Sequence, residues 1–148
     1  FQTLIDLFTT PDARVDLKPK DARAALATLL VRIARADDSY AEAEHQMILD
    51  VLASRYQLSA EAAQQLKQDA EALEAQAPDT VRFTKIVKDA VAYEDRAGVV
   101  EALWRVALAD GARDHEEDGF IRLVVNLLGV SDRDSGLARQ RVIATLGA

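Results

Sequence analysis

The residues of this chain best suited to chemistry are carboxylates that gather at two points of the sequence, 73 residues apart. They are Asp37 and Glu44 in the first group, and Asp110, Asp114 and Glu117 in the second. Carboxylate oxygens are the hard ligands that Ca²⁺ and Mg²⁺ prefer, so each group is a candidate cation site. The spacing is not that of an EF-hand, because the sixth residue counted from Asp110 is His115, where that loop needs glycine.

An internal repeat places the two groups at equivalent positions. Residues 30–38 align with residues 103–111, and Glu44 aligns with Glu117 at the same offset. Two unrelated helices would share an apolar period, but they would not readily keep aspartate and glutamate at the same places. We therefore expect a duplicated helical hairpin with an acidic turn in each copy, and repeat cores at about residues 22–58 and 95–131.

The apolar period also predicts where the helices hold these acids. Asp37 lies four residues after Ile33 and seven after Leu30, which places it on the same helix face. Glu44 lies four residues before Ile48 and falls on the inward stripe of the following helix. If the two stripes pack together, each aspartate comes near its glutamate. Neighbouring carboxylates repel each other, and one pKa rises, unless a cation or several donors intervene.

A structural interpretation of the same residues stays open. Residues 39–42 and 114–117 each match a capping box, and acidic side chains in a first turn suit the positive end of the helix dipole. Arg32 and Arg105, which are equivalent in the repeat, are alternative partners for the carboxylates in place of a metal. The two histidines, His45 and His115, occupy non-equivalent places in the repeat, and we expect both to be exposed helix residues.

Composition and periodicity favour an all-α fold, a single-domain bundle of seven or eight helices over residues 1–148. Apolar residues make up 49% of the chain while Gly (6) and Pro (3) are scarce, a bias that favours helices over a sheet. The first helices are expected near residues 2–8, 21–36 and 47–52. Further helices are expected to begin at Ser59, at Asp79 or Thr80, at Asp95, and at Ser131 or Asp132. Gly129 should end the helix before the last one.

Charge and residue usage exclude several classes of function. The formal net charge of −7 repels phosphate backbones and anionic lipids, so we expect no nucleic-acid binding and no membrane insertion. The chain has no cysteine for disulfides or thiol catalysis, and no apolar run approaches the ~18 residues of a membrane helix. These features fit a cytoplasmic protein. No P-loop, dinucleotide-binding or nucleophile-elbow motif occurs, so we expect no enzyme.

Two further features are explained by structural roles that need no ligand. Trp104 has apolar neighbours and is predicted to lie in the core or in an interface. Arg82, Lys85 and Lys88 form a basic stripe that we interpret as a solvated face, with docking of an acidic partner as the alternative.

At the acidic turns the sequence resembles the TerB-like family, named for a tellurite-resistance protein. Residues 109–111 read Ala-Asp-Gly and are followed by Glu117, seven residues after the aspartate, which matches the family's motif. Ala36 and Asp37 with Glu44 match it as well, except that Asp38 stands where glycine is usual. The similarity extends over roughly residues 22–148.

This resemblance implies an all-helical bacterial protein, either cytoplasmic or membrane-peripheral, whose family is linked to tellurite and other chemical-stress responses and to phage defence. It also implies acidic residues that bind metal, and it brings no catalytic mechanism. A related module occurs in a membrane-anchored DnaJ-like co-chaperone.

We therefore expect a non-catalytic TerB-like module that binds a divalent cation, calcium or magnesium, at its acidic turns. The candidate ligands are Asp110, Asp114, Glu117, Asp37 and Glu44. The alternative is a structural protein–protein interaction domain, similar to the co-chaperone module, in which the acids are helix caps. A metal-dependent hydrolase is a third and weaker hypothesis. An unidentified protein partner is expected in the first two cases, and a homo-oligomer is compatible with the sequence.

Overall fold

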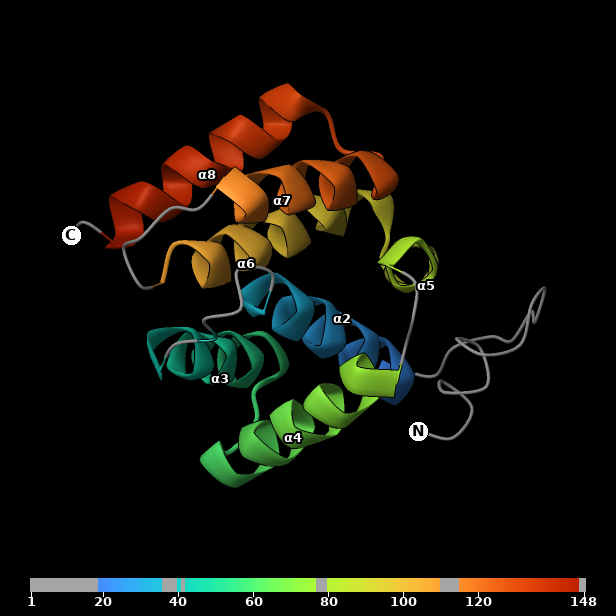
Figure 1. Cartoon of the computed structure of the whole chain (residues 1–148), viewed down its shortest axis with the longest axis vertical. Coiled ribbons are helices and arrows are strands. Elements are labelled where there is room, and N and C mark those ends of the chain that lie inside the picture. The colour runs from blue at the N-terminus through green and yellow to red at the C-terminus, as the bar shows by residue number, and fades with distance from the viewer. Residues whose placement is uncertain (1–18, 36–39, 41, 77–79, 110–114, 147–148) are drawn as a thin grey trace.

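The computed structural model describes residues 19–35, 40, 42–76, 80–109 and 115–146 (Figure 1). The fold is all-α, and these ranges contain no strand. The elements are α2 (Pro19–Ala34), α3 (Glu42–Tyr56), α4 (Ala60–Gln76), α5 (Thr80–Ala90), the 3₁₀ turn η1 (Tyr93–Asp95), α6 (Arg96–Ala107), α7 (His115–Leu127) and α8 (Asp132–Leu146). The helix expected near residues 2–8 lies outside the described residues, and the other expected helices are all present.

Helix α2 is the central element because it is apolar on nearly all sides. Residues 24–31 are all buried, and Thr28, the polar residue among them, donates its hydroxyl to the carbonyl oxygen of Ala24 at 2.6 Å. A helix that is hydrophobic all round must be covered on every side. Accordingly α2 contacts α3, α4, α5, α6 and α7, and Figure 1 shows it between α4 and α6.

None of the described helices combines the length and the apolar character that crossing a membrane requires.

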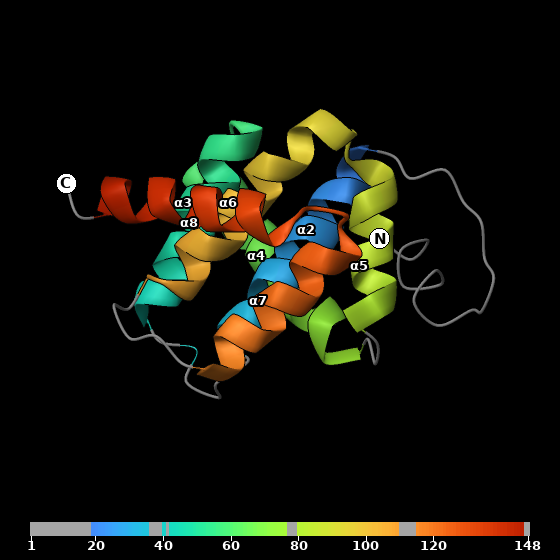
Figure 2. The same ribbon diagram turned by 90° about the horizontal axis from the view of Figure 1, so that it is seen from above.

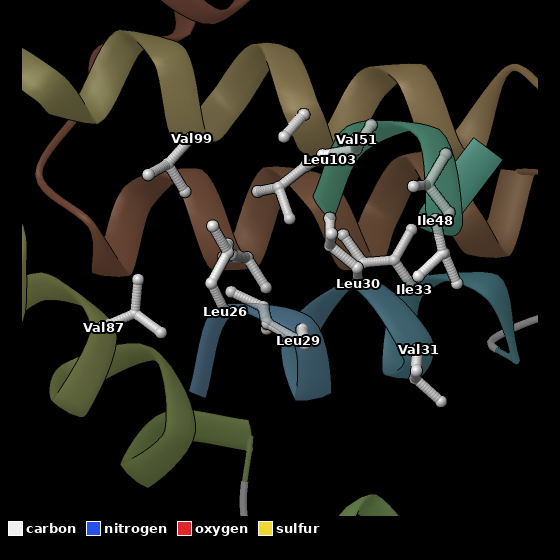
Figure 3. Close-up of a cluster of buried hydrophobic side chains, with 14 of the residues drawn as sticks. Leu26, Leu29, Leu30, Val31, Ile33, Ile48, Val51, Val87, Val99 and Leu103 are labelled. Atoms are coloured by element: carbon white, nitrogen blue, oxygen red, sulfur yellow. The ribbon is translucent and has the colours of Figure 1, made fainter. Parts of the chain in front are cut away.

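A hydrophobic core joins the helices around α2. Figure 3 shows Leu30 and Ile33 of α2 facing Leu103 of α6 and Ile48 of α3, while Val31 lies on the other side of α2. All five side chains are fully buried, as the three- and four-residue spacing along α2 predicts. The core therefore couples the N-terminal and C-terminal helices directly.

The contacts between helices repeat along the chain. Helix α2 packs on α3 and α4 in the way that α6 packs on α7 and α8. Helix α3 begins at Glu42 and α7 begins at His115, at the same offset of 73 that aligns the sequences. We call α2, α3 and α4 the first unit, and α6, α7 and α8 the second unit. The duplicated element thus contains three helices, one more than the hairpin that the sequence predicts.

The connection from the second to the third helix is built alike in both units. Gln57 (φ 53°) and Gly129 (φ 78°) adopt left-handed conformations at the ends of α3 and α7. The N–H of Leu58 donates to the carbonyl of Ala53, and that of Val130 donates to the carbonyl of Val125, which is the bond pattern of a Schellman motif. The expected end of the helix at Gly129 is therefore confirmed.

The next helix in each unit begins with a serine cap. The Ser59 hydroxyl accepts a hydrogen bond from the N–H of Ala62 at 3.1 Å, and the Ser131 hydroxyl accepts one from the N–H of Asp134 at 3.1 Å. The expected cap at Ser59 is confirmed, and of the two residues expected to begin the last helix, Ser131 is the cap. When the two helices are aligned on their caps, Ser59 and Ser131, each position in α4 corresponds to the position 72 residues later in α8.

Helix α5 links the units and packs against both α2 and α7, at one side of the molecule (Figures 1 and 2). Arg96, the first residue of α6, donates from Nη1 to the carbonyl of Leu128 and from Nη2 to the carbonyl of Lys88, both at 3.3 Å. A guanidinium at two helix C-termini satisfies terminal carbonyls and complements both dipoles. In the predicted basic stripe, Lys85 is exposed and Lys88 is partly buried, and the side chain of Arg82 is outside the described part.

Candidate functional site

Of the five predicted ligands, Glu44 is the one whose side chain the structure describes. It is the third residue of α3 and is 0% exposed, one turn before the equally buried Ile48. Its predicted place on the inward stripe is therefore confirmed. The positive end of the α3 dipole favours a carboxylate there. Asp37, Asp110 and Asp114 lie outside the described residues, and so does the side chain of Glu117.

Two arginines at the end of α2 pair with one carboxylate of α4. Arg32 Nε lies 3.3 Å from Glu74 Oε1, and Arg35 Nη1 lies 2.6 Å from Glu74 Oε2. Arg32 Nη2 also reaches the carbonyl oxygen of Glu74 at 3.4 Å. Arg32, which the sequence offers as a partner for the acidic turn, is thus held at least in part by α4.

A buried lysine extends this contact toward α3. Lys67 of α4 is only 5% exposed, and its Nζ lies 3.0 Å from His45 Nδ1 and 3.3 Å from Glu71 Oε1. Because an ammonium group offers only donors, His45 Nδ1 must accept, and the neutral ring then carries its proton on Nε2. The expectation that His45 is exposed is wrong, because its ring packs between Lys67 of α4 and Tyr40, which lies two residues before α3.

The ring of Tyr40 stacks on the His45 ring with centroids 3.6 Å apart and 18° between the planes. The guanidinium of Arg35 lies 5.2 Å from the Tyr40 centroid, and Lys67 Nζ lies 5.9 Å from it, both within the range of cation–π attraction. Burial raises the pKa of Tyr40, and the nearby carboxylate of Glu71 raises it further. The phenol is therefore protonated at neutral pH, although its hydroxyl makes no well-aligned hydrogen bond with the described residues.

The backbone at Tyr40 contradicts one predicted cap. A capping box over residues 39–42 requires Tyr40 to be the first helical residue. Instead Tyr40 has φ 32° and α3 begins at Glu42, so that capping box is wrong. The left-handed backbone turns the Tyr40 ring back onto His45, and this stacking offsets the strain of the conformation. For the box predicted over residues 114–117, α7 does begin at His115, and the side chains lie outside the described part.

These contacts define what we call the first-turn cluster. It comprises Arg32, Arg35, Tyr40, Glu44, His45, Lys67, Glu71 and Glu74. The carboxylate of Glu44 belongs to it because its charge also acts on the pKa of Tyr40. The cluster contains three fixed cations and three carboxylates, so its formal charges balance.

Sequence reasoning missed the contribution of α4 to this cluster. One signal was available: Ala63, Lys67, Ala70 and Leu73 recur at steps of three and four residues and are all buried. A lysine within an apolar stripe needs a partner when the stripe is buried. The identity of that partner depends on how α4 packs, which the local pattern does not contain.

The corresponding positions of the second unit carry different side chains. Leu108 stands in place of Arg35, and Ile143, which is 43% exposed, stands in place of Glu71. Arg139 stands in place of Lys67, and its guanidinium lies 5.6 Å from the ring of Trp104. Trp104 itself is buried, as predicted, and donates from Nε1 to Ser135 Oγ at 3.1 Å. The described part of the second unit therefore does not repeat the first-turn cluster.

Within the described residues, no three aspartate, glutamate or histidine side chains converge as metal ligands do.

The comparison with protein families decides the identity of the fold. The family model for tellurite resistance protein TerB matches residues 23–140, from α2 into α8. The chain belongs to the TerB family. The TerB match covers most of α2, all of α3 to α7 and the first part of α8, so it includes most of both units. No curated protein and no solved structure shows significant similarity to the chain.

Proposed function

We propose that this TerB-family protein is a non-catalytic module that binds one divalent cation, calcium or magnesium, at its second acidic turn. The ligands would come from Asp110, Asp114 and Glu117, which the sequence places on and after that turn. Oxygen ligands without cysteine or a second nearby histidine favour these hard cations. The proposal rests on one observation: the two units differ in the cationic side chains at corresponding positions of their helices.

In the first unit, three cationic side chains lie in the first-turn cluster, and each has a defined partner. Arg32 and Arg35 bind Glu74, and Lys67 binds Glu71 and His45. Carboxylates gathered in one place need such compensation, because mutual repulsion otherwise raises their pKa.

In the second unit, the equivalents of two of these cations are unsuited to that role. Leu108 has no charge, and Arg139 is engaged with Trp104. Of the three equivalent residues, only Arg105 is of the same type as its counterpart, Arg32. The second turn also gains an acid, because Asp118 stands where the first unit has His45. It also gains Arg113 in place of Tyr40, so the aligned segments 37–45 and 110–118 carry the same formal net charge. The units therefore differ in the cations of the flanking helices, and their smaller number in the second unit favours the uptake of a cation from solution.

The family name connects the module with tellurite resistance, which supports a role in a chemical-stress response. A cytoplasmic location, which the absence of cysteine fits, is part of the same proposal. We propose that the bound cation forms part of a surface that contacts a protein partner. The net charge of −7 favours a basic surface on that partner.

Thermal unfolding of metal-stripped protein tests the cation site. Calcium, magnesium, manganese and zinc are added separately to the wild type, to Asp110→Asn and to Glu117→Gln. An ion that binds the native state should stabilise the wild type by about 2.7 kcal/mol at roughly 100 times its Kd, and should stabilise neither variant.

Glu61→Gln is the matched control, because Glu61 is an exposed acid in the first turn of α4. This control should respond to the ion as the wild type does. If no ion raises the Tm of the wild type, the proposed cation site is wrong. If, in addition, both second-turn variants lose stability, the acids are structural caps.

A further inference from the structure

A basic cluster lies where α2 and α3 meet, at Tyr56, the last residue of α3. The guanidinium carbon of Arg23 lies 5.0 Å from the centroid of the Tyr56 ring, and that of Arg55 lies 5.9 Å from it. Both distances are within the range of cation–π attraction. We infer that Arg23 and Arg55 form a binding site for a phosphate group. This site goes beyond the proposed function, because it takes an anion and uses no residue of the acidic turns.

The two guanidinium groups have donors to spare. Neither of them pairs with a carboxylate of the described residues. An arginine presents five N–H donors in a planar fork, which matches the oxygens of a carboxylate or a phosphate. Arg55 is exposed, and Arg23 and Tyr56 are partly exposed, so a ligand in solution can reach all three side chains.

The internal repeat shows the same arginine in a structural role. Arg96 is equivalent to Arg23 at the offset of 73 and donates to carbonyl oxygens at the ends of α5 and α7. Arg23 makes no hydrogen bond with the described residues and has only its contact with the tyrosine ring. The second unit also lacks the other arginine, because Leu128 stands in place of Arg55. The helix packing that both units share therefore does not account for the pair.

Two helix N-termini add positive potential beside the pair. Arg23 follows the first turn of α2. Arg55 lies against the first turn of α6, where a Cβ atom added to Gly98 would meet Arg55 Nη1 at 3.2 Å. Asp95, the N-cap residue of α6, makes no hydrogen bond from its side chain to the helix. The positive end of a helix dipole disfavours a cation and favours an anion, so a bound anion would offset the repulsion among these charges.

Tyr56 adds a third donor and positions the pair. Its ring packs against the hydrophobic core. Burial raises the pKa of the Tyr56 hydroxyl, although the charges of Arg55 and Arg23 act in the opposite direction, so the phenol is protonated at neutral pH. A phosphate group has three free oxygens and nearly two charges for two guanidinium forks, whereas a carboxylate has two oxygens and one charge. The arrangement therefore favours phosphate over a carboxylate.

Calorimetric titration of the full, metal-stripped chain with sodium phosphate tests the site. The wild type should bind phosphate. Arg23→Gln and Arg55→Gln should each weaken the affinity by about tenfold, because each loses a charge-assisted contact. Arg133→Gln is the matched control, since Arg133 is an exposed arginine in the first turn of α8 and its loss changes the net charge equally. This control should bind phosphate as the wild type does.

A parallel titration with phosphoserine separates two sources of the phosphate group. Tighter binding of phosphoserine than of inorganic phosphate would assign the site to a phosphoryl group carried by another molecule. Tighter binding of inorganic phosphate would assign it to the free ion. Both results support the site.

Two results would overturn the inference. One is a wild type that binds neither phosphate nor phosphoserine. The other is an Arg133→Gln protein that loses as much affinity as Arg23→Gln, because net charge and not the cluster would then hold the anion. Circular dichroism checks the fold of each variant. Arg55→Lys provides a second test, since lysine keeps the charge but lacks the planar fork. It should bind phosphate more weakly than the wild type, and an unchanged affinity would also contradict the inference.

Discussion

Helices α4 and α8 start from the same serine cap, follow the same left-handed turn and pack on the first helix of their unit, yet they carry different side chains at corresponding positions. Helix α4 brings Lys67, Glu71 and Glu74 to the end of α2 and the start of α3. At the corresponding positions α8 carries Arg139 and the exposed Ile143.

The comparison separates two kinds of constraint on a duplicated domain. The backbone signals and the buried apolar positions are shared, because both units must close the same core. The polar contacts at the ends of the helices are not needed for that core. They are therefore free to differ, and we expect the functional difference between the units to reside there.

The largest expected effect tests whether the two units share one core. Leu30 and Leu103 are equivalent in the repeat and are both fully buried, on α2 and α6. Leu30→Ala and Leu103→Ala should each lower the free energy of unfolding by about 2–5 kcal/mol, through lost burial and the cavity left behind.

Urea unfolding followed by both circular dichroism and Trp104 fluorescence measures these losses. Because α2 and α6 pack together, the two signals should change in one transition for both variants. A Leu103→Ala protein in which only the fluorescence transition shifts would show that the units unfold separately, and the shared core would be wrong.

A smaller effect sharpens the contrast between the charged contacts of the units. Glu74 accepts from Arg32 and Arg35 in a partly buried setting, whereas Glu101 pairs with Arg141 near the surface, where the Arg141 side chain is 54% exposed. Glu74→Gln should cost about 1–3 kcal/mol, because two guanidinium groups lose a charged acceptor. Glu101→Gln should cost less than about 1 kcal/mol.

Urea unfolding of the two variants at low and high salt measures the difference. The loss from Glu101→Gln should shrink further at high salt because exposed charges are screened. Equal losses for the two variants would mean that the first-turn cluster contributes no more to stability than a surface ion pair.

The sequence predicts best what is local. The stripe of α2, the serine caps at Ser59 and Ser131 and the end of α7 at Gly129 follow from periods and from side-chain chemistry within one turn, and all are confirmed. The inward place of Glu44 follows from the same period.

What the sequence misses depends on contacts distant along the chain. Lys67 meets His45 across 22 residues, and Arg32 meets Glu74 across 42, so neither pair shows in any helical period. The capping box at residues 39–42 fails for a related reason. A stacked His45 ring and two nearby cations stabilise a Tyr40 conformation that local propensity disfavours.

The smallest expected effect concerns the left-handed residue that ends the second helix of each unit. Gln57 and Gly129 hold equivalent places with φ 53° and 78°, but only glycine adopts this region without steric cost. Gln57→Gly should therefore stabilise the protein by about 0.5–1 kcal/mol, and Gly129→Ala should destabilise it by about 1 kcal/mol. Urea midpoints at equal slopes measure both changes.

The two substitutions are expected to change stability in opposite directions. Because neither of them alters the core, the difference would report on the backbone conformation of the turn. A Cβ atom added at Gly129 would come no closer than 3.6 Å to Arg96 Nη1, an ordinary contact, so its cost would be conformational. The side chain of Gln57 is exposed, so its removal should lose little packing. If Gln57→Gly destabilises the protein instead, the greater freedom of glycine in the unfolded chain outweighs the relief of strain. The two turns would then be alike in geometry but not in energy.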